Sequence, residues 1–514
     1  MEFTTDYYPA KEDGEKVDKS NNAAIKIYGN RFISDQTIYE YLIEFLLVFV
    51  AAKTKDGQGI MKFHDEDKTE YYVRPRMGFR RFVFYERAKK LKNIKVDEEA
   101  YKEIRKILKN KLQMPREEDK ENFLKTIQDL FYGYSAILKK RSWSAQALLP
   151  LCPEMILCEE MPNIKERIKG PEESFEKSVD SNSNYYWTFS ETKFTNDNHS
   201  FLARGGELYY LHLLQILDEK PDKKEKLEKL LVHLLTNDSL RFSELVDWIQ
   251  GTWEQEAHID RKCLVEKKNM GYFPKGCYLQ DGIFAVDELI SYLSNNINPI
   301  KRIELLSRGV MLQILRMLAD RTAEYLEIPR QPWIVDMKSK RCGTIIRKLS
   351  MNSFNNVCDN FTTAINRVVA KLTEDDPDSA QIYKLYKLAK KESLDLFKSK
   401  GKELKCVIPS KGPYERFSLS EDLTRFLVLS LVKPKQKMDL DTFLDKLYTN
   451  YGIVIGPNEF KKSNAKENIS SELTEMFNYN RDAFQEFLKS TGFLRDLSDA
   501  TSIVVNPYDE VDLL

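Results

Sequence analysis

A helical spacing of hydrophobic residues runs almost without a break from Leu208 to about Lys400, and it constrains the fold of this chain more than any other feature. Apolar side chains recur there every three or four residues, which places them on one face of successive α-helices. No repeat of fixed length accompanies the pattern, so a regular solenoid is not favoured. We predict an all-α middle domain over 201–405, with helices over 207–217, 224–235, 242–253, 286–293, 303–326, 353–372 and 381–398.

The N-terminal third shows the same spacing, with one exception. Helices are predicted over 37–53, 98–112 and 120–140, whereas Tyr71–Tyr85 alternates polar and apolar residues in the way typical of a short β-hairpin. We therefore predict a helical domain with a β-hairpin insertion over 24–164. A polar, flexible arm over 1–23 would precede it. An exposed linker rich in Glu, Lys, Ser and Asn would follow it over 165–200.

The C-terminal stretch, 414–514, follows a segment rich in Pro and Gly and has its own pattern. Three helices are predicted over 420–432, 440–451 and 481–489, followed by short strands over 493–497 and 502–505. Three helices and a β-hairpin are the plan of a winged helix. The predicted fold class is thus mainly α, with multi-helical N-terminal and middle domains, a small β insertion and a winged-helix-like C-terminal domain.

Composition and charge indicate a chain that folds and stays inside the cell. The 514 residues exceed one ordinary core, and 80 basic residues balance 80 acidic ones, so no global field attracts nucleic acid or membrane. Seven cysteines, odd in number and scattered, favour a reducing compartment. The N-terminus lacks the pattern of a secretory signal, and the apolar segment 37–53 is too short for a span and carries Glu40 and Glu44. We expect a cytoplasmic protein without membrane contact.

Catalytic motifs are missing from the sequence. It has neither of the glycine-rich phosphate-binding loops nor a nucleophile elbow. His258, Cys263 and Cys277 lie within twenty residues, but no Cys pair has the two-to-four-residue spacing of structural zinc sites. A metal-dependent nuclease needs clustered carboxylates, often with a lysine, but neither His64-Asp65-Glu66-Asp67 nor Asp336-Met337-Lys338 has a recognisable partner. We predict neither metal nor cofactor and favour a non-catalytic role, with a divergent metal-dependent nuclease left open.

Two basic stretches are candidate nucleic-acid contacts. Residues 71–95 contain nine basic residues and one acidic residue, interleaved with aromatic rings that could stack on bases, and 338–348 contain five basic residues and no acid. For the first stretch, a hairpin with core-facing aromatics is an equal alternative, and for the second a solvated face is the more common explanation. The residues named for nucleic-acid binding are Arg74, Arg76, Arg80, Arg81, Lys338, Lys340 and Arg341.

The predicted third C-terminal helix argues against reading of DNA sequence by that domain. Over 480–489 its two basic residues are cancelled by two acidic ones, whereas helices in the major groove need a positive environment. We therefore favour a protein contact for this domain. A further anion-binding candidate is the helix start at Arg204, Gly205 and Gly206, although a tight turn whose glycines allow close backbone packing is favoured there.

Four segments carry a resemblance: RSWSAQALLPLCPEMI (141–156), FLARGGELYYLHLL (201–214), YGIVIGPNEF (451–460) and GFLRDLSDATSIVVNPY (492–508). They resemble uncharacterised proteins of bacterial multi-gene anti-phage defence systems. The resemblance implies a subunit that works beside other proteins, such as a motor ATPase or a nuclease, and it transfers no catalytic residue. Our first hypothesis is a scaffold or adaptor subunit with contact to DNA left open. The alternatives are the divergent nuclease and a stand-alone nucleic-acid-binding regulator.

Overall fold

Helices make up most of the computed structural model, and its strands are short. The chain divides into two compact units, each assembled from segments far apart in the sequence. Unit 1 comprises Met1–Ile38, Leu208–Leu230 and Gly271–Leu514, and unit 2 comprises Tyr39–Glu207 and Leu231–Met270. The structure describes residues 7–9, 22–29, 32, 36–65, 68, 70–73, 77–87, 95–136, 149, 152–156, 175–179, 185–189, 205–236, 240–256, 266–275, 277–374, 378–464, 470–498 and 501–513.

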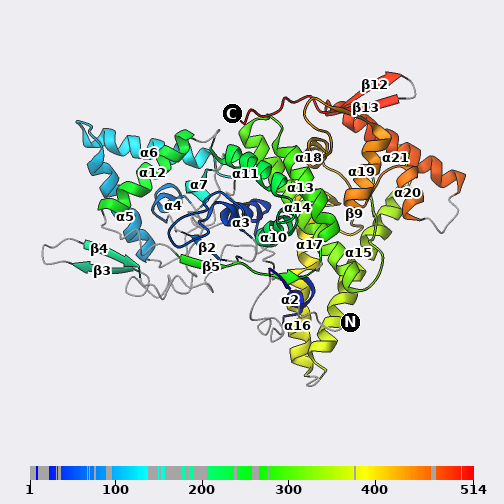
Figure 1. The fold of residues 1–514 in the computed structure, drawn as a ribbon, viewed down its shortest axis with the longest axis horizontal. Coiled ribbons are helices and arrows are strands. Elements are labelled where there is room, and N and C mark those ends of the chain that lie inside the picture. Colours follow the sequence, from blue (N-terminus) through cyan, green and yellow to red (C-terminus); the bar gives the residue numbers. More distant parts are fainter. Residues whose placement is uncertain are drawn as a thin grey trace. The chain divides into compact units, whose positions relative to one another are not determined.

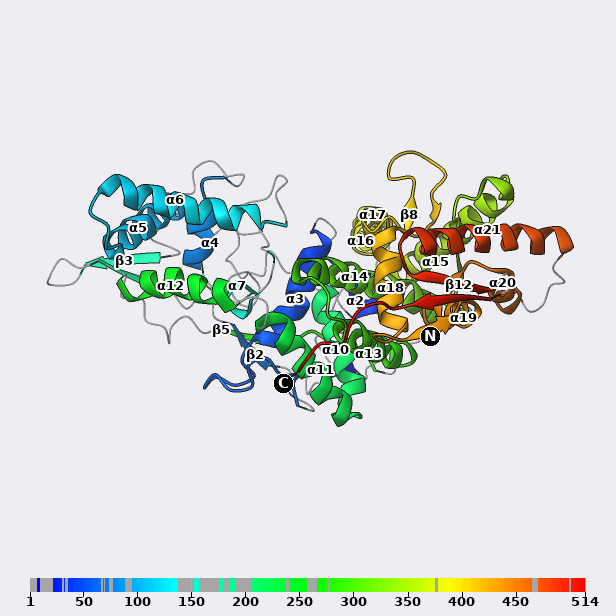
Figure 2. The same cartoon turned by 90° about the horizontal axis from the view of Figure 1, so that it is seen from above.

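Unit 2 is built around α4 (Met77–Phe84), α5 (Lys95–Lys111), α6 (Glu117–Gly133), α7 (Pro153–Ile156) and α12 (Leu240–Glu256), and Figure 2 shows α5 and α6 beside α4. Their apolar faces form one core that includes Phe82, Leu124 and Trp253. α4 approaches α12 so closely that a Cβ on Gly78 would lie 2.3 Å from the Trp253 ring. The unit also contains α3 (Ile38–Val50), whose apolar side chains are buried as the sequence predicts.

The hairpin predicted over Tyr71–Tyr85 is wrong. Strand β2 (Glu70–Val73) ends early and pairs with β5 (Glu266–Asn269), a strand almost two hundred residues later, and α4 begins at Met77. The alternation that suggested a strand also contains the helical spacing of Phe79, Phe82 and Val83, which all face the core. Burial of one helical face therefore decides the structure here.

In unit 1, α14 (Pro299–Tyr325) is buried along most of its length. Its start is set by Asn298, whose side-chain oxygen accepts from the Ile300 N–H at 3.1 Å, with Pro299 in the first turn. The helices α13 (Leu279–Leu293), α15 (Ile345–Leu372), α17 (Leu394–Glu403) and α18 (Glu421–Leu431) pack against it. Gly309 permits the closest approach, because a Cβ there would lie 2.1 Å from the Phe426 ring.

Unit 1 also contains α2 (Ala23–Tyr28) and α16 (Ser379–Glu392). Most residues of α10 (Gly205–Leu217) and α11 (Pro221–Thr236) belong to unit 1 as well, since its second segment is Leu208–Leu230. Short strands join distant segments. β1 (Tyr7–Tyr8) pairs with β6 (Phe273–Pro274), and β7 (Trp333–Ile334) pairs in parallel with β11 (Ile453–Val454). β8 (Val407–Ile408) pairs with β9 (Arg416–Phe417), and the Phe417 ring stacks on Trp333 at 4.8 Å.

The last hundred residues form a compact part of unit 1. After α18 come β10 (Lys437–Asp439), α19 (Leu440–Tyr451), β11, α20 (Pro457–Ser463), α21 (Ser471–Ser490), β12 (Leu494–Ser498) and β13 (Thr501–Val505), drawn in orange and red in Figure 1. The three strands β10, β12 and β13 form one antiparallel sheet in the order β10-β13-β12. α21 is twice as long as the predicted helix, since Ser470 caps its start through the Leu473 N–H.

The predicted helices of the middle region are confirmed, although α13 and α15 begin seven or eight residues earlier than predicted and 381–398 divides into α16 and α17. Most of the predicted arm and linker lies outside the described residues. Among the described residues of these two segments, Tyr7–Tyr8 forms β1, and β3 (Phe175–Val179) pairs with β4 (Tyr185–Phe189). In the described parts of the chain, no helix is long and apolar enough to cross a membrane.

Candidate contact surface

The loop that follows β7 is anchored at its base by Asp336. Its side chain is buried, pairs with the Arg416 guanidinium at 2.8 Å and accepts the Lys338 N–H at 2.7 Å. The second bond draws the backbone into a tight turn, in which Lys338 has a φ of 62°. A buried carboxylate that is both paired and hydrogen-bonded holds such a turn firmly. The Asp336-Met337-Lys338 segment, considered above as part of a nuclease, is thus used to shape the loop.

Asn480 of α21 fixes the same loop from the other side. Its fully buried amide donates to the carbonyl oxygens of Val335 and Ile455, both at 2.9 Å, and accepts the Met337 N–H at 2.9 Å. Val335 and Ile455 follow the paired strands β7 and β11, so one side chain joins both strand ends to α21. The loop and the helix therefore form a single rigid element.

An apolar cluster fills the space between this loop and α21. It contains Ile346 from α15, Val454 from β11 and Phe477 from α21, together with Cys342, whose thiol donates to the Met476 carbonyl oxygen at 3.3 Å. Burial raises the pKa of the Cys342 thiol, so this cysteine is a neutral core residue and not a nucleophile. Cys342 ends a short 3-10 turn over Lys340–Cys342 that leaves the neighbouring cations outside.

The cations of this loop are exposed. Lys338 and Lys340 have no acidic partner among the described residues, and the same holds for Arg347 and Lys348 in the first turn of α15. Cations at a helix N-terminus oppose the helix dipole, so these two residues do not stabilise α15. Arg341 is engaged differently: it pairs with Asp482 at 3.3 Å and lies over the Tyr479 ring at 3.8 Å. We call residues 338–348 the basic surface.

The basic surface extends along α15 in a way that was not predicted from the sequence. Asn352, Asn355 and Asn356 are exposed and follow Lys348 at steps of four, seven and eight residues, which places them on one helical face. Among the exposed residues of α15, the first acidic one is Asp359. Amide side chains next to cations can contact both phosphates and base edges. The helical spacing of the asparagines in MNSFNN was the signal available in the sequence.

The exposed face of α21 has the opposite charge. Its exposed charged residues are all acidic, whereas both cations of the helix are partly buried and engaged, Arg481 with Asp441 at 2.7 Å and Lys489 with Glu486 at 2.9 Å. Over 480–489 the basic and acidic residues are equal in number, whereas the whole of α21 contains more acidic than basic residues. We call these residues the acidic face: Glu472, Glu475, Asp482 and Glu486.

The other predicted nucleic-acid contacts lie elsewhere. Arg80 and Arg81 of α4 are buried in unit 2, with 2% and 0% of each residue exposed, and Arg74 and Arg76 fall outside the described residues. A fully buried guanidinium cannot reach a phosphate without local unfolding. The structure therefore gives Arg80 and Arg81 an internal position and does not bring them to a surface with Lys338, Lys340 and Arg341.

The helix start at Gly205 and Gly206 already has an internal anion. The Gly206 N–H donates to the Glu44 carboxylate at 2.7 Å, and a Cβ on Gly206 would lie 2.2 Å from the Tyr41 carbonyl oxygen. A carboxylate at a helix N-terminus is favoured by the helix dipole. Close backbone packing, the alternative favoured for this site, accounts for Gly206, while Arg204 lies outside the described residues.

In the described parts of the chain, no three His, Cys, Asp or Glu side chains lie close enough together to bind a metal ion. Of the considered trio, Cys277 is buried and its thiol pKa is raised to about 12 by desolvation, while His258 and Cys263 lie outside the described residues. No family model matches the chain, and neither the curated proteins nor the solved structures yield a match.

Proposed function

We propose that this protein is a non-catalytic adaptor whose C-terminal part is a winged-helix-like domain that contacts a partner protein through α21. The observation that carries the proposal is the acidic face. In a winged helix, the helix before the β-hairpin is the one that enters the major groove, and α21 has that place before β12 and β13. An acidic face repels phosphates, whereas it attracts a basic protein surface.

The order of elements supports the winged-helix assignment. A first helix, a strand, a second helix, a third helix and a two-stranded hairpin correspond to α18, β10, α19, α21 and the β12–β13 pair, with β11 and α20 inserted between α19 and α21. The added strand pairing of β10 with β13 is antiparallel, from Lys437 with Val505 to Asp439 with Ile503. Membership of a bacterial defence complex rests on the sequence resemblance alone, and it supplies the natural set of partners, the products of neighbouring genes.

Contact with nucleic acid through the basic surface is a second candidate function. It is favoured by the four exposed cations without acidic partners and by the amide face that continues them along α15. These residues lie beside the acidic face, because Arg341 and Asp482 form an ion pair. An adaptor could thus hold a basic partner on α21 and a nucleic acid on the adjoining surface.

The adaptor proposal is tested by co-purification with the products of the neighbouring genes. A variant with Glu475→Gln, Asp482→Asn and Glu486→Gln removes most of the acidic face without changing side-chain size. We expect the amount of bound partner to fall roughly tenfold or more, since interface charges contribute a few kcal/mol together. The matched control, Asp359→Asn, Glu374→Gln and Asp509→Asn, removes three exposed acids elsewhere in unit 1 and should retain the partner. Equal retention by both variants would refute the proposed contact.

A further inference from the structure

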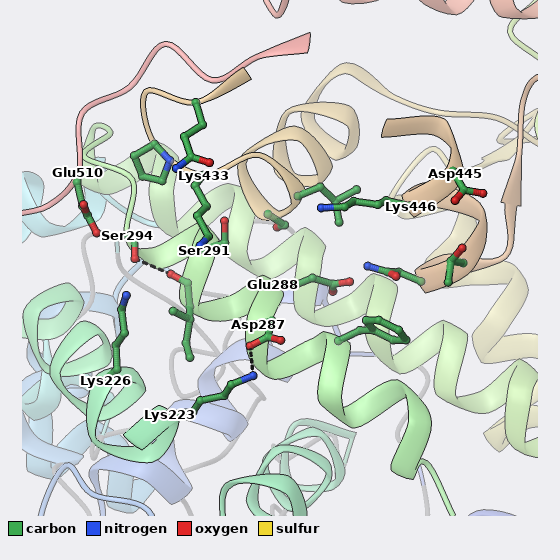
Figure 3. Close-up of a pocket in the computed structure, with 18 residues that line it drawn as sticks. Lys223, Lys226, Asp287, Glu288, Ser291, Ser294, Lys433, Asp445, Lys446 and Glu510 are labelled. Atoms are coloured by element: carbon green, nitrogen blue, oxygen red, sulfur yellow. Dashed lines mark hydrogen bonds and ion pairs between the residues drawn. The ribbon is translucent and has the colours of Figure 1, made fainter. Parts of the chain in front are cut away.

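A cavity of about 860 Å³ lies in unit 1, above α13. Its lining residues come from the first turns of α11, from α13, from the end of α18 and the turn after it, from α19 and from Glu510 (Figure 3). This volume is in the range of about 300–1,000 Å³ that small-molecule sites occupy. All of its lining belongs to one unit, so the cavity is a property of a single compact body.

Lysines surround the cavity from separate elements. Lys226 of α11, Lys433 of the turn after α18 and Lys446 of α19 all line it, and none of the three has an ion pair in the described part of the chain. Figure 3 shows these side chains around the space over α13. A fourth, Lys223, is neutralised by Asp287 at 2.5 Å. Three unpaired cations around one cavity create a positive potential that favours an anion.

The acidic groups of the lining cancel this charge only in part. Asp287 and Asp445 are already paired with Lys223 and Lys462, whereas Glu510 is exposed, as Lys226 and Lys433 are. Glu288 is 3% exposed and accepts a hydrogen bond from the Gln313 amide. The exposed Lys226 and Lys433 and the buried Glu288 carboxylate are therefore two separate polar regions of the lining.

The lining also includes serines, and one of them has a buried hydroxyl. Ser430 is 4% exposed and lines the cavity, and its Oγ has no hydrogen-bond partner among the described residues. Buried polar groups are nearly always hydrogen-bonded, because an unmade bond is costly. Ser291 on the facing helix differs, since its hydroxyl donates to the Leu429 carbonyl oxygen at 3.2 Å.

The remaining residues of the lining are suited to contact a planar ring of a ligand. Phe284, Leu431 and Pro434 present apolar surface, and the Glu288 carboxylate is an acceptor for N–H groups. Lysine is a common phosphate ligand, because its ammonium group is a compact point charge. From these features we infer that the cavity binds a nucleotide-sized phosphate ester. Lys226, Lys433 and Lys446 hold the phosphate, and Glu288 accepts hydrogen bonds from the ring. This activity goes beyond the adaptor role and does not depend on it.

The inference is tested with the purified full-length chain and three probes: ATP, inorganic pyrophosphate and adenosine. Calorimetry should show ATP binding, weaker binding of pyrophosphate, and much weaker binding of adenosine. The triple variant Lys226→Gln, Lys433→Gln and Lys446→Gln should bind ATP roughly tenfold or more weakly. Glu288→Gln should weaken the binding of ATP and leave the binding of pyrophosphate unchanged. Because Glu288 is buried, the folding of this variant is checked by circular dichroism.

A matched variant separates a specific site from general charge. Lys384→Gln, Lys387→Gln and Lys391→Gln remove the same charge from exposed positions on α16, outside the cavity, and should bind ATP as the wild type does. Failure of the wild type to bind ATP, or equal losses in the two lysine variants, would overturn the inference. Equal losses of ATP and pyrophosphate in a folded Glu288→Gln variant would overturn the position of the ring.

Discussion

The side-chain nitrogen of Asn480 lies 2.9 Å from the carbonyl oxygen of Val335, although the two residues are 145 positions apart. The same side chain also bonds Ile455 and Met337, so α21 cannot shift without breaking two buried hydrogen bonds and a partly buried one. The acidic face and the basic surface are consequently held in one fixed geometry. A partner that binds one of them meets a preorganised neighbour, which lowers the entropic cost of association.

The hydrogen bonds of Asn480 can be tested by mutation. Asn480→Ala leaves two buried carbonyl groups and one partly buried N–H without partners, and each unmade buried bond costs about 1–3 kcal/mol. We expect the free energy of unfolding to fall by roughly 3 kcal/mol or more, measured by urea denaturation. Asn478→Ala, an exposed position on the same helix, should change it by less than about 0.5 kcal/mol. Equal small effects would show that Asn480 does not anchor α21.

A second prediction concerns the basic surface. The variant Lys338→Gln, Lys340→Gln and Arg341→Gln should weaken binding to DNA. The slope of log K against log salt concentration should also become less steep, by about 0.9 for each phosphate contact that is lost. Fluorescence anisotropy with labelled single- and double-stranded DNA, over a range of salt concentrations, gives both quantities. Lys411→Gln, Lys437→Gln and Lys461→Gln remove equal charge from other exposed positions of unit 1. If the two variants behave alike, the basic surface is not a specific contact.

A third prediction follows from the buried thiols. Burial raises the pKa of the Cys277, Cys358 and Cys406 thiols to about 12, against about 8.5 in an unfolded chain. Above about pH 8.5 the unfolded state binds fewer protons than the folded state, so these thiols make stability fall as pH rises toward 12. At about pH 8 they should react with Ellman's reagent only at the rate of unfolding.

Two cysteines outside the described residues must be removed to read this result. In a Cys158→Ser, Cys263→Ser background, only the five described cysteines remain, and all five are buried. A fast stoichiometric reaction of the folded protein would contradict their burial. The fall in stability between about pH 9 and 11 should also be smaller in Cys406→Ala, because one of the titrating thiols is gone.

The helices could be predicted because their information is local. The spacing that places Leu227, Leu230 and Leu234 on one apolar face needs no knowledge of the rest of the chain. The exceptions come from distant pairing. Nothing near Glu70–Val73 reveals that its partner is Glu266–Asn269, and the two-unit organisation depends on such long-range contacts. The local pattern over Tyr71–Tyr85 therefore led to a hairpin that does not exist.

The candidate site could be predicted in part. The basic residues Lys338, Lys340 and Arg341 are visible as a run without acids, and the structure exposes them. Their neighbour α21 could not be placed beside them, because the link through Asn480 joins segments far apart in the sequence. A charge count also cannot distinguish a surface arginine from Arg81, which is fully buried. Burial is set by packing, and packing requires the partners.

The most direct test of the adaptor role is hydrogen–deuterium exchange on the chain alone and on the complex isolated by co-purification. We predict that peptides of α21, Ser471–Ser490, gain protection when the partner is bound, while those of α16, Ser379–Glu392, do not. Protection that spares α21 and appears only elsewhere would contradict the proposed contact through the acidic face.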